Sequence, residues 1–276
     1  MIRQPLAKAV LASLLAWGTA SCAVTDSPTA FTAAHRTSLQ AAIAAPTRTA
    51  ANLQRDRYRH PFETLSFFGV RPSDTVVEIW PGGGWYTEIL APYVMQGGGR
   101  YYAAASANGL NGVRRMMETN STLYGGVNLA AFPARQPSDS RVPDGSTDVV
   151  LTFRNVHNWL MGETPFADEA FRQMYAMLKP GGTLGIVDHR LPETVDSARE
   201  RSSGYLKTST VRRLAEQAGF RFVGASEVNA NPRDTADHPQ GVWTLPPTLR
   251  LGDQDRERYV AIGESDRMTL RFVKPM

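Results

Sequence analysis

Cysteine is almost absent from this sequence, and long apolar runs and blocks of one charge are missing as well. The single cysteine among 276 residues excludes an intramolecular disulfide framework and a structural zinc site built from several cysteines. The apolar run at residues 9–17 is too short to cross a bilayer, which takes about 20 residues. With 30 Lys and Arg against 26 Asp and Glu, the net charge is only +4 and no basic block occurs, so we expect no nucleic-acid partner.

The first 21 residues have the pattern of a secretory signal rather than of a folded domain. Arg3 and Lys8 precede the apolar run, and the small residues at 18–21 follow it. A positive start, a short apolar core and a small-residue end are typical of a signal peptide. We therefore predict a signal peptide at residues 1–21 and an exported protein, either periplasmic or anchored to a membrane as a lipoprotein.

Cys22 stands directly after this segment, where a bacterial lipoprotein signal places its acylated cysteine. Thr19-Ala20-Ser21-Cys22 resembles a lipobox, although Thr19 occupies a position where Leu, Val or Ile is usual. A lipid on Cys22 is the one membrane contact that the sequence predicts. The alternative is ordinary cleavage after Ala20 or Ala23, with Cys22 incidental.

Strand-like and helix-like segments alternate along the rest of the chain. Short apolar runs bounded by turn residues predict buried strands, and apolar positions at helical spacing predict helices between them. The predicted strands cover residues 75–79, 100–105, 127–132, 148–153, 183–187, 220–228 and 267–273. The predicted helices cover residues 38–45, 52–68 with an interruption at Pro61, 86–94, 111–118, 165–178 and 208–218. This alternation predicts an α/β fold with a mainly parallel, seven-stranded sheet flanked by helices.

The domain organisation follows from the same pattern. Residues 22–50 are rich in Ala, Thr, Ser and Pro, which predicts a tether followed by an N-terminal helix. Residues 51–276 form one domain, because no linker divides them. A polar, proline-containing insert is expected at residues 229–264, and its segment 231–239 predicts either a solvated loop or an ordered loop that acts as a lid over a substrate. The Lys-Pro-Gly-Gly segment at residues 179–182 is expected to end the helix before the fifth strand.

The strongest chemical signal follows the first predicted strand. Glu78 lies near the strand end, and Pro81, Gly82, Gly83 and Gly84 lead into a helix. Glycines at this place let the backbone approach a ligand closely, and the helix N-terminus supplies N–H groups without partners. The segment therefore predicts a cofactor-binding loop, with a bare tight turn as the alternative.

Two kinds of nucleotide-binding loop fit this segment poorly. No Gly-Lys-Ser/Thr follows the glycines, which argues against a phosphate-binding P-loop. Thr87 stands where a dinucleotide-binding loop needs its third glycine, so a nicotinamide oxidoreductase is the weaker interpretation.

Three segments in order resemble the class I S-adenosylmethionine (SAM)-dependent methyltransferases. Glu78-x-x-x-Gly82-x-Gly84 is similar to the family's first motif, but Trp80 stands where the family usually has glycine. Residues 143–150 and 177–184 are similar to the segments that lead into the family's fourth and fifth strands. The resemblance implies a Rossmann-like methyltransferase fold.

A narrower resemblance rests on other segments. Residues 55–61, 78–85 and 152–159 together resemble predicted exported methyltransferases of bacteria.

The resemblance also implies how SAM is held. The loop that contains Glu78 would bind it, Arg59 would bind its carboxylate, and Asn155 would contact its amino or carboxylate end. Methyltransferases usually carry an acidic residue after the second strand for the ribose hydroxyls. Here Ser106 and Asn108 stand in that region, and neither supplies the charge-assisted pair of hydrogen bonds that a carboxylate forms.

Polar residues follow the fourth and fifth predicted strands, where the methyl group should lie. His157 is the first candidate for a general base, because its ordinary pKa of about 6.5 suits neutral pH. Asp188 would orient His157 or His189, and His189 is itself a candidate base. Structural roles in the loops are the alternatives. The same three side chains could also hold a metal ion, but no spacing requires one and we predict none.

The sequence therefore predicts a SAM-dependent methyltransferase that acts on a small molecule. The acceptor and the oligomeric state stay open. The alternative is an exported, non-enzymatic binding protein that has kept the fold, because the ribose-binding acid is missing and SAM is made in the cytoplasm.

Overall fold

The computed structural model describes Met1 and residues 31–276 of the chain. The predicted signal peptide, Cys22 and the first part of the tether lie outside the described residues. Among the described residues, no helix has the length and apolar character that crossing a membrane requires.

Seven strands form one sheet in the order β3-β2-β1-β4-β5-β7-β6. The strands are β1 (Thr75–Ile79), β2 (Arg100–Ala105), β3 (Asn128–Ala131), β4 (Thr147–Phe153), β5 (Leu178–His189), β6 (Arg221–Ser226) and β7 (Arg267–Val273). The neighbours from β3 to β5 pair in parallel, whereas β7 pairs antiparallel with both β5 and β6. The prediction of a mainly parallel, seven-stranded sheet is confirmed.

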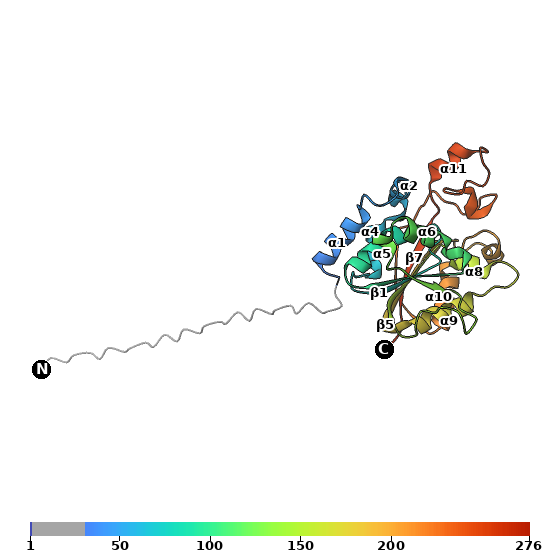
Figure 1. Ribbon diagram of the computed structural model, residues 1–276. Coiled ribbons are helices and arrows are strands. Elements are labelled where there is room, and N and C mark those ends of the chain that lie inside the picture. The colour runs from blue at the N-terminus through green and yellow to red at the C-terminus, as the bar shows by residue number, and fades with distance from the viewer. Residues whose placement is uncertain (2–30) are drawn as a thin grey trace. The chain divides into compact units, whose positions relative to one another are not determined.

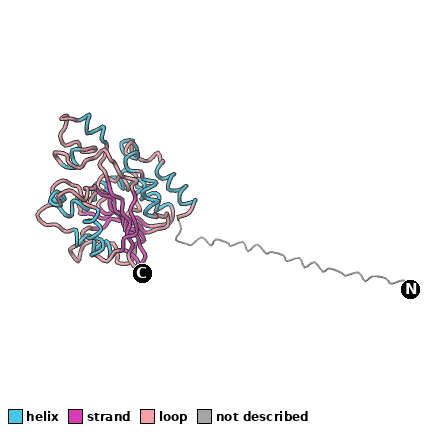
Figure 2. The backbone as a smooth tube through the Cα atoms, turned by 180° about the vertical axis from the view of Figure 1, so that it is seen from behind, coloured by secondary structure: helices cyan, strands magenta, loops and turns pink. Residues whose placement is uncertain are grey.

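Helices cover both faces of this sheet, and the strands run between them (Figures 1 and 2). The helices are α1 (Ala33–Ile43), α2 (Ala50–Leu53), α3 (Asp56–Arg59), α4 (Pro61–Phe68), α5 (Thr87–Gln96), α6 (Asn111–Thr119), α7 (Ser121–Tyr124), α8 (Val156–Leu160), α9 (Ala167–Met177), α10 (Thr208–Gln217) and α11 (Arg256–Ile262). The part of the chain that the structure describes also contains short 3-10 helices, namely η1 (Asn108–Leu110), η2 (Ser197–Arg201) and η3 (Gly241–Thr244).

The pleat of the strands explains the two layers. Successive side chains of a strand point to opposite faces. Val77 and Ile79 of β1 accordingly belong to one buried cluster with α8, α9 and α10, whereas Val76 belongs to the other with α1, α4 and α5. Because both faces of the sheet centre are covered, the parallel strands β1 and β4 are buried at most positions, whereas the edge strand β6 alternates between exposed and half-buried residues.

The predicted helix bounds are wrong near the N-terminus. Helix α1 starts at Ala33 rather than at residue 38, because Thr32 and His35 form a capping box at its start. For residues 52–68 the predicted interruption at Pro61 is confirmed, because α4 starts there, but the part before it is two short helices, α2 and α3, rather than one. His60 adopts the left-handed conformation (φ 41°) before Pro61, and proline disfavours the α conformation in the residue that precedes it.

The expected turn at residues 179–182 is also wrong. Helix α9 ends at Met177, and β5 begins at the next residue, five positions before the predicted strand. Leu178 pairs with Thr147, and the register between β4 and β5 then shifts. Gly181 adopts a positive φ of 78°, so the glycine pair shapes an irregularity inside a strand rather than a helix stop.

The insert at residues 229–264 is an ordered part of the fold. It contains η3 and α11, and Asn229, His238 and Thr244 within it are buried. The solvated-loop alternative is therefore wrong for these residues. Trp243 of η3 also reaches the ring of His157, with 6.2 Å between the ring centroids.

Candidate functional site

A cavity of about 170 Å³ opens beyond the carboxyl ends of β1 and β4. The strand order reverses between these two strands, and ligands of open α/β sheets bind at such a crevice. The cavity is lined by Glu78 and residues 80–83, 85 and 86, by residues 153–155 at the end of β4, and by Asn52, Arg55 and Arg59. It is smaller than the roughly 300–1,000 Å³ of usual small-molecule pockets.

The glycine loop presents open backbone to this cavity. A Cβ added at Gly82 or Gly83 would meet no atom within 4 Å, so a ligand can approach the main chain there. Gly82 (φ 58°) and Gly84 (φ 84°) adopt the left-handed conformation that favours glycine. The loop thus has the shape that the sequence predicts for a cofactor-binding segment.

Trp80 occupies a strained position before this loop. Its φ is 54°, in a region that L side chains rarely adopt, which agrees with the glycine that methyltransferases usually have there. Its indole stacks edge-on against Trp159, with ring centroids 6.0 Å apart, and Nε1 donates to the Phe132 carbonyl at 3.2 Å. These contacts offset a backbone cost of about 1–3 kcal/mol.

Glu78 lines the cavity, but its carboxylate is already engaged. Oε2 accepts hydrogen bonds from Thr87 Oγ1 at 2.9 Å and from the Tyr101 hydroxyl. Burial raises the pKa of Glu78 to about 7, although both hydrogen bonds act to lower it. At neutral pH this group is therefore close to half protonated, and a ligand has to compete with two protein donors for it.

Asn155 connects the two sides of the crevice. Its Nδ2 donates to the carbonyls of Ile79 and Trp80 at 3.0 and 3.2 Å and to Thr152 Oγ1 at 3.1 Å. These bonds hold the start of the glycine loop against β4. Asn155 lines the cavity with Pro81, Gly82 and Gly83, as the sequence predicts for a cofactor site.

Ser106 and Asn108 lie apart from this group. Both are exposed in the turn after β2, and neither lines the cavity. Ser106 Oγ accepts from the Gly109 amide at 3.1 Å. Their role in binding the ribose stays a prediction.

Arg59 reaches the cavity from α3. Its Nε donates to Glu264 Oε2 at 3.1 Å, and its guanidinium lies over the ring of Trp85, 4.7 Å from the centroid. Arg55 joins the same carboxylate through Nε at 2.8 Å. Arg59 thus lines the cavity, together with arginines that the sequence did not single out, and its binding of a carboxylate stays a prediction.

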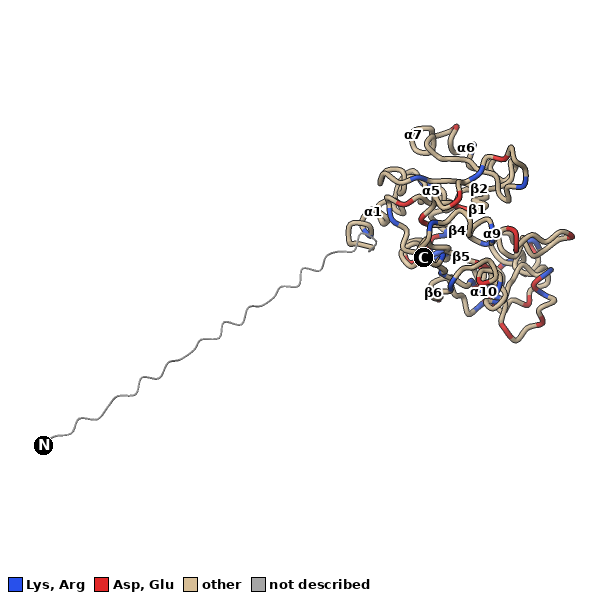
Figure 3. Tube along the Cα trace, turned by 90° about the horizontal axis from the view of Figure 1, so that it is seen from below, with Lys and Arg blue, Asp and Glu red and all other residues tan. Residues whose placement is uncertain are grey.

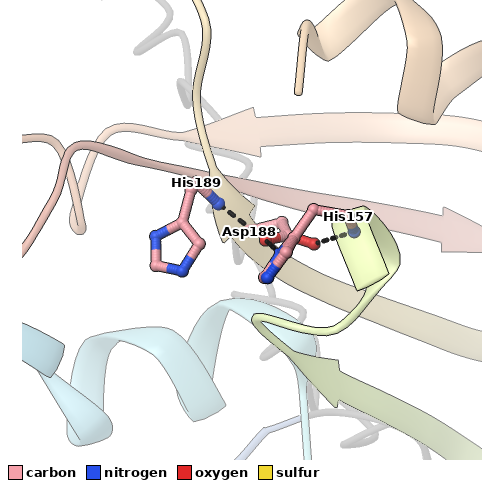
Figure 4. Close-up of side chains that lie close together, drawn as sticks. All are labelled: His157, Asp188 and His189. Carbon is pink, nitrogen blue, oxygen red and sulfur yellow. Dashed lines mark hydrogen bonds and ion pairs between the residues drawn. The ribbon is translucent and has the colours of Figure 1, made fainter. Parts of the chain in front are cut away.

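The three predicted catalytic residues lie together at the ends of β4 and β5 (Figure 4). His157 Nδ1 lies 2.8 Å from Asp188 Oδ1, and the His157 amide donates to Oδ2 at 3.1 Å. A carboxylate can only accept, so Nδ1 carries the hydrogen and Nε2 is left as the basic nitrogen. The structure places Asp188 against His157, which is the arrangement of an oriented general base.

His189 has a different partner. Its Nδ1 lies against Ser265 Oγ, while its amide donates to Asp188 Oδ1 at 2.8 Å. Burial lowers the pKa of His189 well below its usual value, and His157 and Arg154 lower it further. This imidazole therefore stays neutral at neutral pH.

A metal ion is less consistent with this geometry. One ligand atom from each of His157, Asp188 and His189 lies within 4.8 Å of the others. Both Asp188 oxygens, however, already accept hydrogen bonds from these two histidines. Oδ1 already accepts two of these hydrogen bonds, so a metal bound at Oδ1 would have to displace one of them, whereas Oδ2 accepts only one. The contacts present are those of a His157–Asp188 dyad.

The sequence predicted the glycine loop and the pair His157 and Asp188 as parts of one site, but it did not predict the charged residues around the cavity. Arg55, Arg154, Glu264 and Arg267 were not predicted as site residues. Arg55 and Arg59 stand four positions apart, a spacing that puts two helical side chains on one face, and this was the signal available. Glu264 and Arg267 carry no such signal. Asn155, two residues before His157, lines the cavity, but His157 itself does not.

Comparisons with known proteins identify the fold. No family model matches the sequence, and no curated protein matches it either. The structure is similar to a SAM-dependent methyltransferase from Aquifex aeolicus, at 16% identity over 80% of this chain and 93% of that chain, with a TM-score of 0.53. It is also similar to phosphoethanolamine N-methyltransferase 2 of Haemonchus contortus in complex with SAM, at 17% identity over 79% of this chain and 53% of that chain, with a TM-score of 0.51.

The chain has the Rossmann-like methyltransferase fold. This fold does not fix one activity, because the cyclase SpnF is similar to the chain as well. It matches at 18% identity over 74% of this chain and 76% of that chain, with a TM-score of 0.51. Within the methyltransferase fold, function has to be argued from the side chains of the site.

Proposed function

We propose that this protein is a SAM-dependent methyltransferase that acts on a small-molecule acceptor. The observation that carries the proposal is an open glycine loop at the switch point of the sheet, together with His157, which lies on α8 just after the adjacent strand β4 and is oriented by Asp188. Methyl transfer with proton removal requires a loop that holds the cofactor and an oriented base nearby. Here the base, His157, stands two residues after Asn155, which lines the cavity.

The residues around the cavity fit the amino-acid end of SAM. Gly82 and Gly83 leave the space that a ligand needs beside the main chain. Arg59 Nη2 is buried and has no hydrogen-bond partner among the described residues, so it can bind a carboxylate. When bound, SAM would supply a methyl group on a sulfonium, which is open to in-line attack by a nucleophile.

His157 would remove the proton of the acceptor. The Asp188 carboxylate fixes the ring and holds the hydrogen on Nδ1, so that Nε2 accepts the proton as the acceptor attacks. Asp188 also stabilises the imidazolium that this transfer creates. Asp188 is thus a positioning residue, and His157 is the residue that would contact the acceptor.

Calorimetric titration with SAM and transfer of its labelled methyl group to a panel of small molecules would test the proposal. The wild-type chain should bind SAM and methylate at least one acceptor. His157→Ala should lower kcat by about 10²–10⁴-fold while SAM still binds, because general-base catalysis contributes about that much. Asn158→Ala, an exposed neighbour on α8, is the matched control. Absence of SAM binding at millimolar ligand would refute the proposal.

A non-enzymatic binding protein is the second candidate. It is favoured by the engaged carboxylate of Glu78 and by the small volume of the cavity. Ligand binding without methyl transfer, unaffected by His157→Ala, would support this alternative.

We also propose that the protein is exported and carries a lipid on Cys22. The support is the residue pattern of the first 22 positions alone. Labelling of cells with a palmitate analogue should mark the wild-type chain but not Cys22→Ser. Recovery of both chains unlabelled and uncleaved from the cytoplasm would refute it.

A further inference from the structure

Positive charge is concentrated at the cavity. Along the rest of the described chain, Lys and Arg are interspersed with Asp and Glu (Figure 3). The cavity instead is lined by three guanidinium groups, those of Arg55, Arg59 and Arg154, and by a single carboxylate, that of Glu78. Because Glu78 is close to half protonated at neutral pH, it compensates less than one of these charges.

Glu264 is the nearby counter-ion, and its single negative charge is shared by three arginines. It accepts from Arg55 Nε at 2.8 Å, from Arg59 Nε at 3.1 Å and from Arg267 Nη1 at 3.1 Å. Burial by itself would raise the pKa of Glu264, but Arg59, Arg267, Arg55 and Arg154 lower it to about 2. One carboxylate thus holds Arg55 and Arg59 through Nε and Arg267 through Nη1. The terminal nitrogens Nη2 of Arg55 and Arg59 are left without an acceptor among the described residues, whereas Nη2 of Arg267 donates to the Tyr58 carbonyl.

The leftover nitrogens are buried donors. Nη2 of Arg55 and Nη2 of Arg59 are both buried and have no hydrogen-bond partner among the described residues. Arg59 is only 5% exposed. A buried guanidinium donor without an acceptor costs free energy, so the arrangement is complete only when an acceptor occupies the cavity.

Arg154 contributes a third free group. Its guanidinium forms no hydrogen bond or ion pair with any residue of the described chain, although it lines the cavity. Its backbone is held at φ 64° while its amide donates to Val187 at 2.7 Å. Burial lowers the pKa of Arg154 to about 10 and that of Arg59 to about 9, so both remain charged at neutral pH.

We propose that Arg55 and Arg154 bind a carboxylate or phosphate group of the methyl acceptor, while Arg59 binds the carboxylate of SAM, so that the substrate is an acidic small molecule. The inference rests on the proposed function. The amino-acid end of SAM is a zwitterion, whose carboxylate is offset by its own ammonium group. Bound SAM therefore neutralises little of the excess positive charge of the cavity, and a second anion can bind there. Paired donors from arginine suit the planar or tetrahedral oxyanions of carboxylates and phosphates.

Titration with inorganic phosphate tests this proposal without relying on turnover. Phosphate should bind the wild-type chain, and its affinity should change by less than about threefold when S-adenosylhomocysteine is saturating. Arg154→Gln should weaken phosphate binding by roughly tenfold to hundredfold, because a charge-assisted hydrogen bond is lost. Arg154 is the best position to change, since its side chain holds no part of the described fold together.

Two further variants sharpen the result. Arg154→Lys should recover part of the affinity, because it restores the charge. Arg135→Gln, which removes an exposed arginine paired with Glu169, should leave phosphate binding unchanged.

Four outcomes would overturn the proposal. No phosphate binding, or equal loss in Arg154→Gln and Arg135→Gln, would show that there is no anion site. Full displacement of phosphate by S-adenosylhomocysteine would show that the arginines serve the cofactor's carboxylate instead. Phosphate binding without any binding of S-adenosylhomocysteine would refute the methyltransferase proposal. The anion site would then belong to an anion-binding protein rather than to a methyl acceptor.

Discussion

Glu78 shows how burial changes the chemistry of one carboxyl group. The sequence places an acid at the end of a strand, where it is expected to contact a ligand. In the fold it lies under the glycine loop, 3% exposed, with Thr87 and Tyr101 donating to it. Burial raises its pKa to about 7 because the charged form loses its hydration.

This shift predicts a pH-dependent stability that Glu78→Gln should remove. Between the ordinary pKa of 4.5 and about 7, folded Glu78 holds its proton while the unfolded chain has lost it. The free energy of unfolding therefore falls as pH rises through this window, by about 3 kcal/mol in total. Urea unfolding of both proteins should show that the free energy of unfolding of Glu78→Gln, relative to that of the wild type, rises by this amount between pH 4.5 and pH 8.

The comparison isolates Glu78, because His189 and other titrating groups are common to both proteins. Glu63→Gln, at an exposed carboxylate, is the control and should follow the wild type. Parallel profiles for Glu78→Gln and the wild type would contradict the buried-acid assignment.

At the scale of elements, the glycine loop joins β1 to α5. Its glycines serve two different purposes, the backbone turn and the space for a ligand. Gly84 adopts φ 84°, and a Cβ there would lie 2.5 Å from Met116 Sδ. Gly83 has ordinary backbone geometry and faces open space. Gly84 is therefore required by the turn itself, whereas Gly83 is required only if a ligand uses that space.

Alanine substitutions should separate these two roles. Gly84→Ala should lower the free energy of unfolding by about 1–3 kcal/mol, since its backbone would be strained. Gly83→Ala should change it by less than about 1 kcal/mol but weaken S-adenosylhomocysteine binding by about tenfold, because the methyl group fills space that the ligand needs. Urea unfolding and calorimetry measure both. Unchanged affinity in Gly83→Ala would show that the ligand does not approach the loop there.

At the scale of the whole described chain, the C-terminal insert is tied to the sheet through buried polar contacts. The Asp234 carboxylate, with no exposed side-chain area, lies 2.8 Å from His238 Nε2 and accepts from the Tyr205 hydroxyl at 3.0 Å. It also accepts from the Asp266 amide at 2.8 Å, directly before β7. One side chain thus joins the insert, the segment after β5 and the last strand.

Removal of this acceptor should destabilise the fold. Asp234→Ala leaves Tyr205, His238 and the Asp266 amide without their common partner, so the free energy of unfolding should fall by about 2–4 kcal/mol. Asp237→Ala, at an exposed neighbouring carboxylate, should change it by less than about 0.5 kcal/mol. Equal losses in both variants by urea unfolding would mean that the insert is held by other contacts.

The sequence by itself determined the number of strands in the sheet and their succession along the chain, and it placed most of the candidate site residues at the ends of three of them. The bounds predicted for β1, β2 and β7 match the structure, because apolar runs bounded by turn residues depend only on neighbours in the chain. The glycine loop and the polar residues after β4 and β5 were predicted together for the same reason. Parallel strands bring their carboxyl ends to one edge of the sheet.

Only the tertiary structure decided how these parts interact. It placed Asp188 against His157 rather than His189, engaged Glu78 with Tyr101, and brought Glu264 to Arg59 from 205 positions away. Such contacts depend on which elements pack side by side, and a long-range ion pair leaves no local pattern in the sequence. The excess positive charge of the cavity therefore became visible only when α3, β4 and the segment before β7 met at one place.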